Sequence, residues 1–130
     1  MISNLVTNHG NLFYFKEEKK LIVEIDEDFQ RYYLNQIPKY LLPRKTKFKP
    51  HISVIRNETN IDLSNLNFKQ VKYSYIPIIN YDDVYFWISV FSLDLACIRM
   101  KVGLTPTKIG VTFSPNKNSS FRITIANKKY

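Results

Sequence analysis

The sequence predicts a small α+β domain, and three observations lead to this fold class. Short segments with alternating apolar and polar residues, such as His51–Arg56 and Val84–Val90, are typical of strands. Between them lie segments with the spacing of short helices, among them Leu93–Lys101. The chain has 130 residues, of which 45% are apolar, and this size fits one globular domain spanning residues 1–130.

The first part of the chain predicts a hairpin followed by a helix. Leu12–Lys16 and Leu21–Ile25 are short β-rich segments joined by four charged residues. Asp26 or Asp28 is suited to cap a helix that reaches about Ile37, because a carboxylate accepts hydrogen bonds from free amides of the first turn. Two prolines follow and end the helix.

The rest of the chain predicts further strands and one more helix. In the strand His51–Arg56, alternation puts Ile52 and Val54 on one face and His51, Ser53 and Ile55 on the other. Gly103 is expected to stop the helix at Leu93–Lys101. The remaining predicted strands are Phe68–Ile76, Val84–Val90, Val111–Phe113 and Phe121–Ala126.

Composition narrows the classes of function. Lys and Arg number 19 against 11 for Asp and Glu, so the net charge is +8 and the chain is expected to attract polyanions. A single cysteine excludes an intramolecular disulfide framework, and two histidines leave little for a metal centre. We expect no cofactor, no metal and no membrane span. The first residues lack the pattern of a signal peptide, which predicts a cytoplasmic protein.

Two predicted strands carry similar polar residues about 70 positions apart. In the first, His51 and Ser53 share one face; in the second, Arg122 and Thr124 do. If the strands lie close together, two basic groups and two hydroxyls converge on one wall. Such a set is suited to hold a phosphate, because the cations supply charge and the hydroxyls supply hydrogen bonds.

These motifs resemble the paired His-x-Thr/Ser motifs of the 2H phosphoesterases, a superfamily that includes LigT-type RNA cyclic phosphodiesterases and phage anti-CBASS nucleases. The second motif, Phe121-x-Ile-Thr-Ile-Ala-Asn127, and the segment Ile98–Leu104 before it contribute to the resemblance. The resemblance implies a two-lobed fold with antiparallel sheets around a central cleft. It also implies metal-independent cleavage of cyclic oligonucleotides, in which one histidine acts as base and the other as acid, and a viral protein that removes a host immune signal.

The sequence departs from this family where the second histidine is expected, because Arg122 occupies that position. Arginine stays protonated at working pH and cannot relay a proton, although it can clamp a phosphate. Three explanations stay open: a slow enzyme that uses His51 alone, a binder that sequesters a nucleotide, or a substitution that traps substrate. His9, the other imidazole, lies in a turn-like segment.

Further candidates for ligand binding are aromatic or basic. Tyr85 and Trp87 share a strand face and suit base stacking, although burial of that strand on both sides would explain them equally. Tyr14 has a weaker claim of the same kind. In the basic run before His51, Arg44 and Lys49 would attract an anionic ligand, although such runs are usually solvated loops.

Three functions follow from these observations. The first is a 2H-type phosphodiesterase acting on cyclic nucleotides or oligonucleotides, and the second is an inactive protein of that fold that binds the same ligand. The third is an unrelated basic RNA-binding module, although the sequence has no RNP motif, KH loop or zinc knuckle.

Overall fold

The strands of the chain close into a barrel. The computed structural model describes residues 5–106 and 121–128. The strands are β1 (Val6–Phe15), β2 (Lys20–Glu24), β3 (Pro43–Lys45), β4 (His51–Arg56), β5 (Gln70–Tyr81), β6 (Tyr85–Phe91) and β7 (Phe121–Lys128). The helices are α1 (Glu27–Leu34) and α2 (Leu93–Lys101), with 3-10 turns η1 (Lys39–Leu41) and η2 (Ser64–Leu66).

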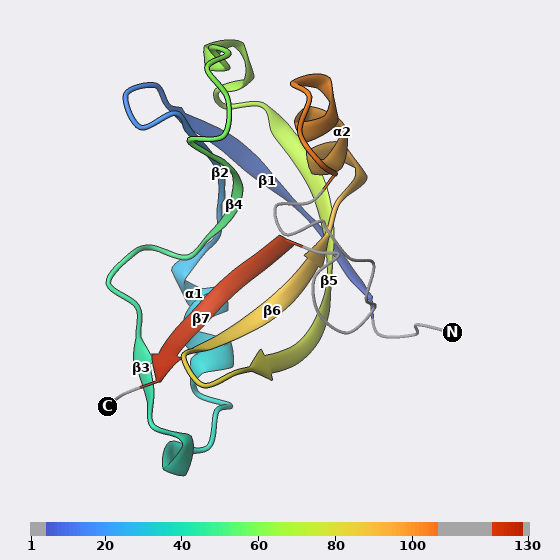
Figure 1. The fold of residues 1–130 in the computed structure, drawn as a ribbon. Coiled ribbons are helices and arrows are strands. Elements are labelled where there is room, and N and C mark those ends of the chain that lie inside the picture. Colours follow the sequence, from blue (N-terminus) through green and yellow to red (C-terminus); the bar gives the residue numbers. More distant parts are fainter. Residues whose placement is uncertain (1–4, 107–120, 129–130) are drawn as a thin grey trace.

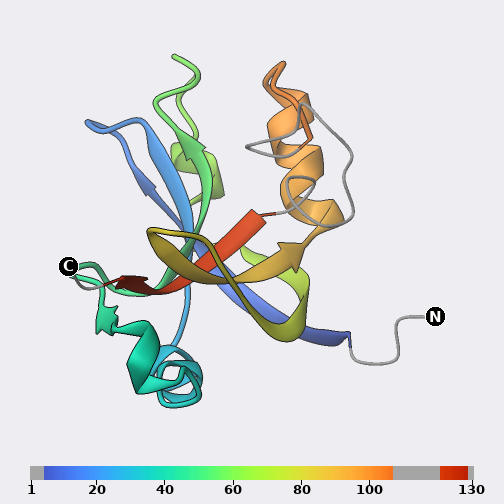
Figure 2. The same ribbon diagram turned by 60° about the horizontal axis from the view of Figure 1, so that its bottom comes forward.

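The prediction of a two-lobed α+β fold is wrong. The strand order is β3-β7-β4-β2-β1-β5-β6, and a further pairing of β6 with β7 closes six antiparallel strands into one barrel. The short strand β3 pairs with the end of β7 outside this ring. In Figures 1 and 2, α2 and the β1–β2 turn lie toward one end of the barrel, and α1 and η1 lie toward the other. Local alternation predicts most of the strands. It does not predict β3, where a basic connection was expected, or the first part of β1, where a turn was expected around His9. It also does not show that β7 inserts between β4 and β6.

Apolar side chains that alternate along the strands fill the barrel. On β4, β6 and β7 the fully buried residues include Ile52, Ile88 and Ile123, each 0% exposed. Ile52 lies opposite Ile123 across the β4–β7 pair. Because side chains alternate between the two faces of a strand, the residues on either side of these isoleucines face outward. The candidate phosphate-binding residues are among those outward-facing residues.

Two irregularities in strand register add buried positions. Between β2 and β4 the register shifts so that Val54 has no partner on β2, and Val54 and Ile55 are both buried. The expectation that Ile55 shares a face with His51 and Ser53 is therefore wrong, because this bulge turns Ile55 inward. Between β6 and β7 a second shift falls at Ile125, and Ile125 and Ala126 are both buried.

A polar side chain caps the start of each helix, and for α1 it is one of the two residues predicted. Asp26 Oδ1 accepts a hydrogen bond from the amide of Asp28 at 2.8 Å and caps α1, which ends at Leu34 rather than Ile37. Ser92 Oγ caps α2 by accepting from the amide of Leu95 at 3.1 Å. Gly103, with φ of 83°, follows the end of α2 as predicted. The predicted strand Val111–Phe113 lies outside the described residues.

A buried arginine fastens α2 to β4. Arg99 is 1% exposed, and its Nη1 donates to the carbonyl oxygen of Val54 at 2.7 Å, the unpaired residue of the bulge. The same guanidinium pairs with both carboxylate oxygens of Glu58, at 3.0 and 2.9 Å. A buried charge needs this degree of pairing.

In the described part of the chain, no helix has the length and apolar character needed to cross a membrane.

Candidate functional site

The predicted phosphate-binding residues meet on the outer wall of the barrel, on strands β4, β7 and β6. The Ile52–Ile123 pair fixes the antiparallel register of β4 and β7, which puts His51 beside Thr124 and Ser53 beside Arg122. On the other edge of β7, Thr124 pairs with Trp87 and Arg122 pairs with Ser89 of β6. The two motifs, distant in sequence, therefore form one continuous surface.

This surface forms the floor of a pocket with a volume of about 570 Å³. Ligand sites for small molecules typically span roughly 300–1,000 Å³, so the pocket has room for a nucleotide. Its walls come from β4, β6, β7 and the loop that precedes β4. The lining residues that belong to the sequence prediction are Lys49, His51, Ser53, Tyr85, Trp87, Arg122 and Thr124.

The His51 ring is oriented by the backbone of the loop before it. Its Nδ1 lies 2.8 Å from the carbonyl oxygen of Lys49. Because a carbonyl oxygen only accepts hydrogen bonds, Nδ1 must carry a proton in this contact. In the neutral ring, Nε2 is then the nitrogen with a free lone pair, so it can accept a proton or a hydrogen bond from a ligand.

The Arg122 side chain is held by an aromatic ring. Its guanidinium carbon lies 4.0 Å from the centroid of the Trp87 ring, a cation–π contact. Among the described residues, the buried Nε of Arg122 has no hydrogen-bond partner. Burial lowers the pKa of Arg122, and the charge of Asp82 partly opposes this effect. The group nevertheless keeps its charge in the working range of pH. Arg122 is therefore a cation held in place in the pocket lining.

The charged residues that line the pocket are all positive among those described. Five of its lining residues carry positive charges: Lys20, Lys47, Lys49, Arg56 and Arg122. Among the described residues, no carboxylate lines the pocket. The acidic residue whose charge acts on Arg122 is Asp82, at the turn between β5 and β6. Its Oδ1 accepts hydrogen bonds from the amides of Tyr85 at 2.7 Å and Val84 at 2.8 Å. The pocket therefore favours an anion.

Trp87 supports the cation more than it offers a stacking surface. Its side chain is 8% exposed, and the guanidinium of Arg122 covers one face of the ring. Tyr85 is 45% exposed and lines the same pocket. Of the two aromatic residues proposed for base stacking, Tyr85 is the more accessible.

Three residues considered from the sequence lie away from the pocket lining. Tyr14 is on β1, where it packs against the hydrophobic core. Arg44 is on β3, opposite Asn127 of β7, and therefore borders the pocket at its rim. His9 pairs with Lys72 of β5 and lines a different hollow. His9 thus does not supply a second imidazole beside His51.

Several lining residues were missed in the sequence, and Phe48 is the most prominent of them. It is 75% exposed and stands within the basic run, between Lys47 and Lys49. An aromatic residue interleaved with lysines is a signal for nucleic-acid binding that the sequence already contained. Lys47 belongs to the basic run considered from the sequence, and the other missed lining residues are Lys20, Thr46, Pro50, Arg56, Phe121 and Asn127.

The described residues hold no group of three or more His, Cys, Asp or Glu side chains that could bind a metal ion. Comparisons of the chain with protein-family models, with curated proteins and with solved structures give no match. The geometry of the pocket is therefore the evidence for its function. Its described lining offers five cations, the hydroxyls of Ser53 and Thr124 beside Arg122, and one imidazole.

Proposed function

We propose that this pocket binds the phosphodiester group of a nucleotide ligand. The observation that carries the proposal is that the described part of the lining has five cations and no carboxylate. A phosphodiester needs positive charge and hydrogen-bond donors at the same place, and an arginine fork supplies both. The wall formed by Arg122, Thr124, His51 and Ser53 presents these groups side by side.

Arg122 is the central group of this proposal. Its contact with Trp87 restricts the side chain before any ligand arrives, and Arg122 lines the pocket. A restrained side chain loses less entropy on binding than a free one. We assign to it the direct contact with phosphate oxygens. The hydroxyls of Ser53 and Thr124 add neutral donors on either side.

Titration of cyclic dinucleotides and trinucleotides, linear oligonucleotides and mononucleotides into the purified chain tests the proposal. Arg122→Ala should weaken binding of the best ligand about 10–100-fold, the size expected for hydrogen bonds to a charged group. Arg31→Ala is the matched control, because Arg31 is exposed on α1 and pairs with Asp28 at 2.6 Å. Equal affinities for the two variants would overturn the proposal.

Cleavage of the bound phosphodiester is a second candidate, favoured by the contact between His51 and the Lys49 carbonyl. Nε2 of the neutral ring would take the proton of an attacking water or ligand hydroxyl. The attacking oxygen bonds to phosphorus as the bond to the leaving oxygen breaks. Within the described lining there is no second imidazole or carboxyl, so the leaving oxygen takes its proton from solvent water.

Chromatography of the ligand after incubation separates binding from cleavage. Ligand returned intact identifies a binding protein, and linear or shortened products identify an enzyme. For an enzyme, His51→Ala should lower the rate about 10²–10⁴-fold, because a general base contributes about that much. An unchanged rate in this variant would exclude His51 as the base.

A further inference from the structure

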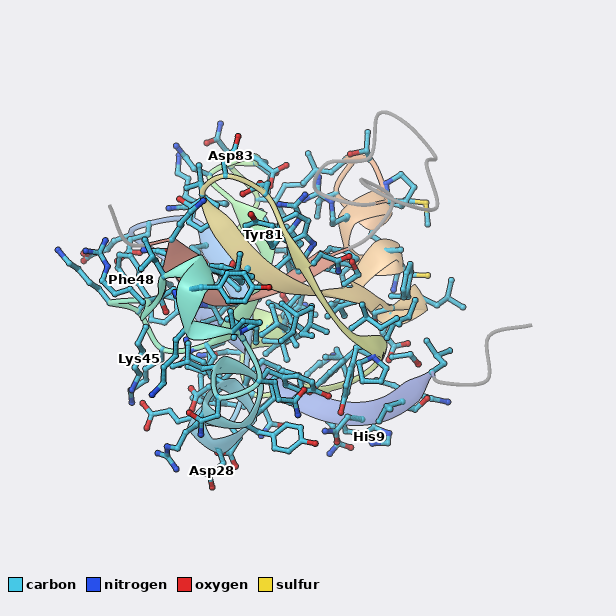
Figure 3. The ribbon with its side chains drawn as sticks, turned by 90° about the horizontal axis from the view of Figure 1, so that it is seen from below. His9, Asp28, Lys45, Phe48, Tyr81 and Asp83 are labelled. Atoms are coloured by element: carbon cyan, nitrogen blue, oxygen red, sulfur yellow. The ribbon has the colours of Figure 1, made fainter. Side chains whose placement is uncertain are left out.

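Phe48 stands at the rim of the basic pocket with most of its ring exposed to solvent. It is 75% exposed and lines the same pocket as Arg122. In Figure 3, Phe48 and Lys45 lie at the same side of the molecule, away from His9. Exposed apolar residues are common on protein surfaces, so exposure alone assigns no role. Phe48 differs from other exposed apolar residues because hydrogen bonds hold the loop that carries it.

A chain of hydrogen bonds ties the Phe48 backbone to the barrel. Gln30 of α1 is 1% exposed, and its Nε2 donates to the carbonyl oxygen of Ile125 and to Thr46 Oγ1, both at 3.0 Å. Thr46 Oγ1 in turn donates to the carbonyl oxygen of Phe48 at 3.0 Å. The buried amide therefore links β7 to the loop. This network fixes the loop, so its exposed ring has a defined place beside the pocket.

A second exposed ring in the pocket lining is that of Tyr85. Tyr85 on β6 is 45% exposed, and its strand partner on β7 is Asn127, also in the pocket lining. Arg44 follows on β3, opposite Asn127. Residues paired across strands point to the same side of a sheet, so these three side chains form a polar and aromatic row beside the pocket.

We propose that Phe48 stacks on an unpaired nucleobase whose adjacent phosphate lies on Arg122. The ligand class is therefore single-stranded nucleic acid. Its bases expose both faces, whereas those of a duplex are already stacked on their neighbours. Phe48 offers one flat apolar face and no polar atom, so it recognises that a base is present without reading its identity. This inference rests on the phosphate-binding function proposed above.

Two oligomers of equal length and charge test the inference. One is a labelled single-stranded oligothymidylate, and the other has the same backbone with abasic sites in place of its bases. The wild-type chain should bind the oligomer with bases about 10-fold or more tightly than the abasic one, the effect expected of one stacked base. Phe48→Ala should reduce that ratio toward one and leave the affinity for the abasic oligomer unchanged. Phe48→Trp should preserve the ratio.

The control is Phe68→Ala. Phe68 is also highly exposed, at 69%, but it packs edge-on against Phe13 and is not part of the pocket lining. This variant should keep the wild-type ratio. A ratio unchanged by Phe48→Ala would overturn the stacking role while the phosphate site stands. Failure of the wild-type chain to bind either oligomer would overturn the single-stranded ligand class, whereas the phosphate site is judged separately by the titration of cyclic nucleotides and mononucleotides against Arg122→Ala.

Discussion

The guanidinium of Arg122 lies over the ring of Trp87, with 4.0 Å between the guanidinium carbon and the ring centroid. The two residues come from neighbouring strands, β7 and β6, and their side chains point out of the barrel wall into the same pocket. The contact explains how a partly buried cation is kept in place without a carboxylate in the pocket lining. It also gives Trp87 a role different from base stacking.

Replacing Trp87 should therefore weaken phosphate binding through Arg122. We expect Trp87→Leu to lower the affinity for a nucleotide ligand about 3–10-fold, since a cation–π contact contributes about 0.5–2 kcal/mol. In the Arg122→Ala background the same substitution should have almost no effect, because the group it supports is gone. Calorimetric titration of the wild type, the two single variants and the double variant measures this coupling. Additive losses would show that Trp87 acts independently of Arg122.

Much of the local structure could be predicted from the sequence. The strand His51–Arg56 and the helix Leu93–Lys101 have the predicted bounds, because hydrophobic period and capping residues act over a few positions. The bulge at Val54 was not predictable, because it depends on pairing with β2 and on the guanidinium of Arg99. Closure of the barrel was missed for the same reason: it depends on pairing between β6 and β7.

The candidate site was more accessible to prediction than the fold. His51, Ser53, Arg122 and Thr124 could be grouped because two strands carry the same polar pattern, and period two puts each pair on one face. That reasoning requires the strands to be neighbours but does not depend on the architecture around them. The position of Phe48 between two lysines was visible in the sequence and was overlooked. The hydrogen bonds that hold its loop could not be predicted, because they involve Gln30 on a different element.

The Arg99–Glu58 pair should be a major source of stability. Arg99 is 1% exposed and donates to Val54 as well as to Glu58. Arg99→Ala should lower the free energy of unfolding by about 3–5 kcal/mol, because it removes the buried guanidinium that joins the bulge carbonyl of Val54 to the carboxylate of Glu58. Urea denaturation measures the loss. The exposed pair of Arg31 and Asp28 is the control, and Arg31→Ala should cost less than about 1 kcal/mol.

Stability should also fall at alkaline pH because of Tyr33. Burial, followed by the influence of Tyr75, raises the pKa of Tyr33 to about 12 from an ordinary value of 10.0. The folded state then retains a proton that the unfolded state loses. The contribution of Tyr33 is complete below pH 10 and is lost as the pH rises toward 12.

The measurement is the free energy of unfolding between pH 9 and about pH 12 for the wild type and for Tyr33→Phe. The wild type should lose roughly 2 kcal/mol more than the variant over this range. Burial also raises the pKa of Tyr73, so the variant keeps part of the decline. Identical pH profiles would show that the Tyr33 hydroxyl titrates alike in the folded and unfolded states.

Asp82 should limit the affinity of the pocket for anions. Hydrogen bonds from the amides of Tyr85 and Val84 hold the pKa of Asp82 below its ordinary value, so the carboxylate is ionised at neutral pH. Its negative charge acts on Arg122. Asp82→Asn keeps an oxygen that can accept the two amide hydrogen bonds and removes the charge. We expect this variant to bind a nucleotide ligand about 2–5-fold more tightly at low ionic strength, the range for an exposed charge pair.

Salt dependence and a second variant identify the cause of this gain. The advantage of Asp82→Asn should shrink as salt rises toward about 1 M, where the Debye length is about 3 Å and exposed charges are screened. Asp82→Ala removes the charge and also the acceptor that shapes the turn before Tyr85. It should therefore lower the melting temperature, whereas Asp82→Asn should change it little. Weaker binding by Asp82→Asn, with its fold intact, would mean that the carboxylate helps Arg122 rather than competing with the ligand for it.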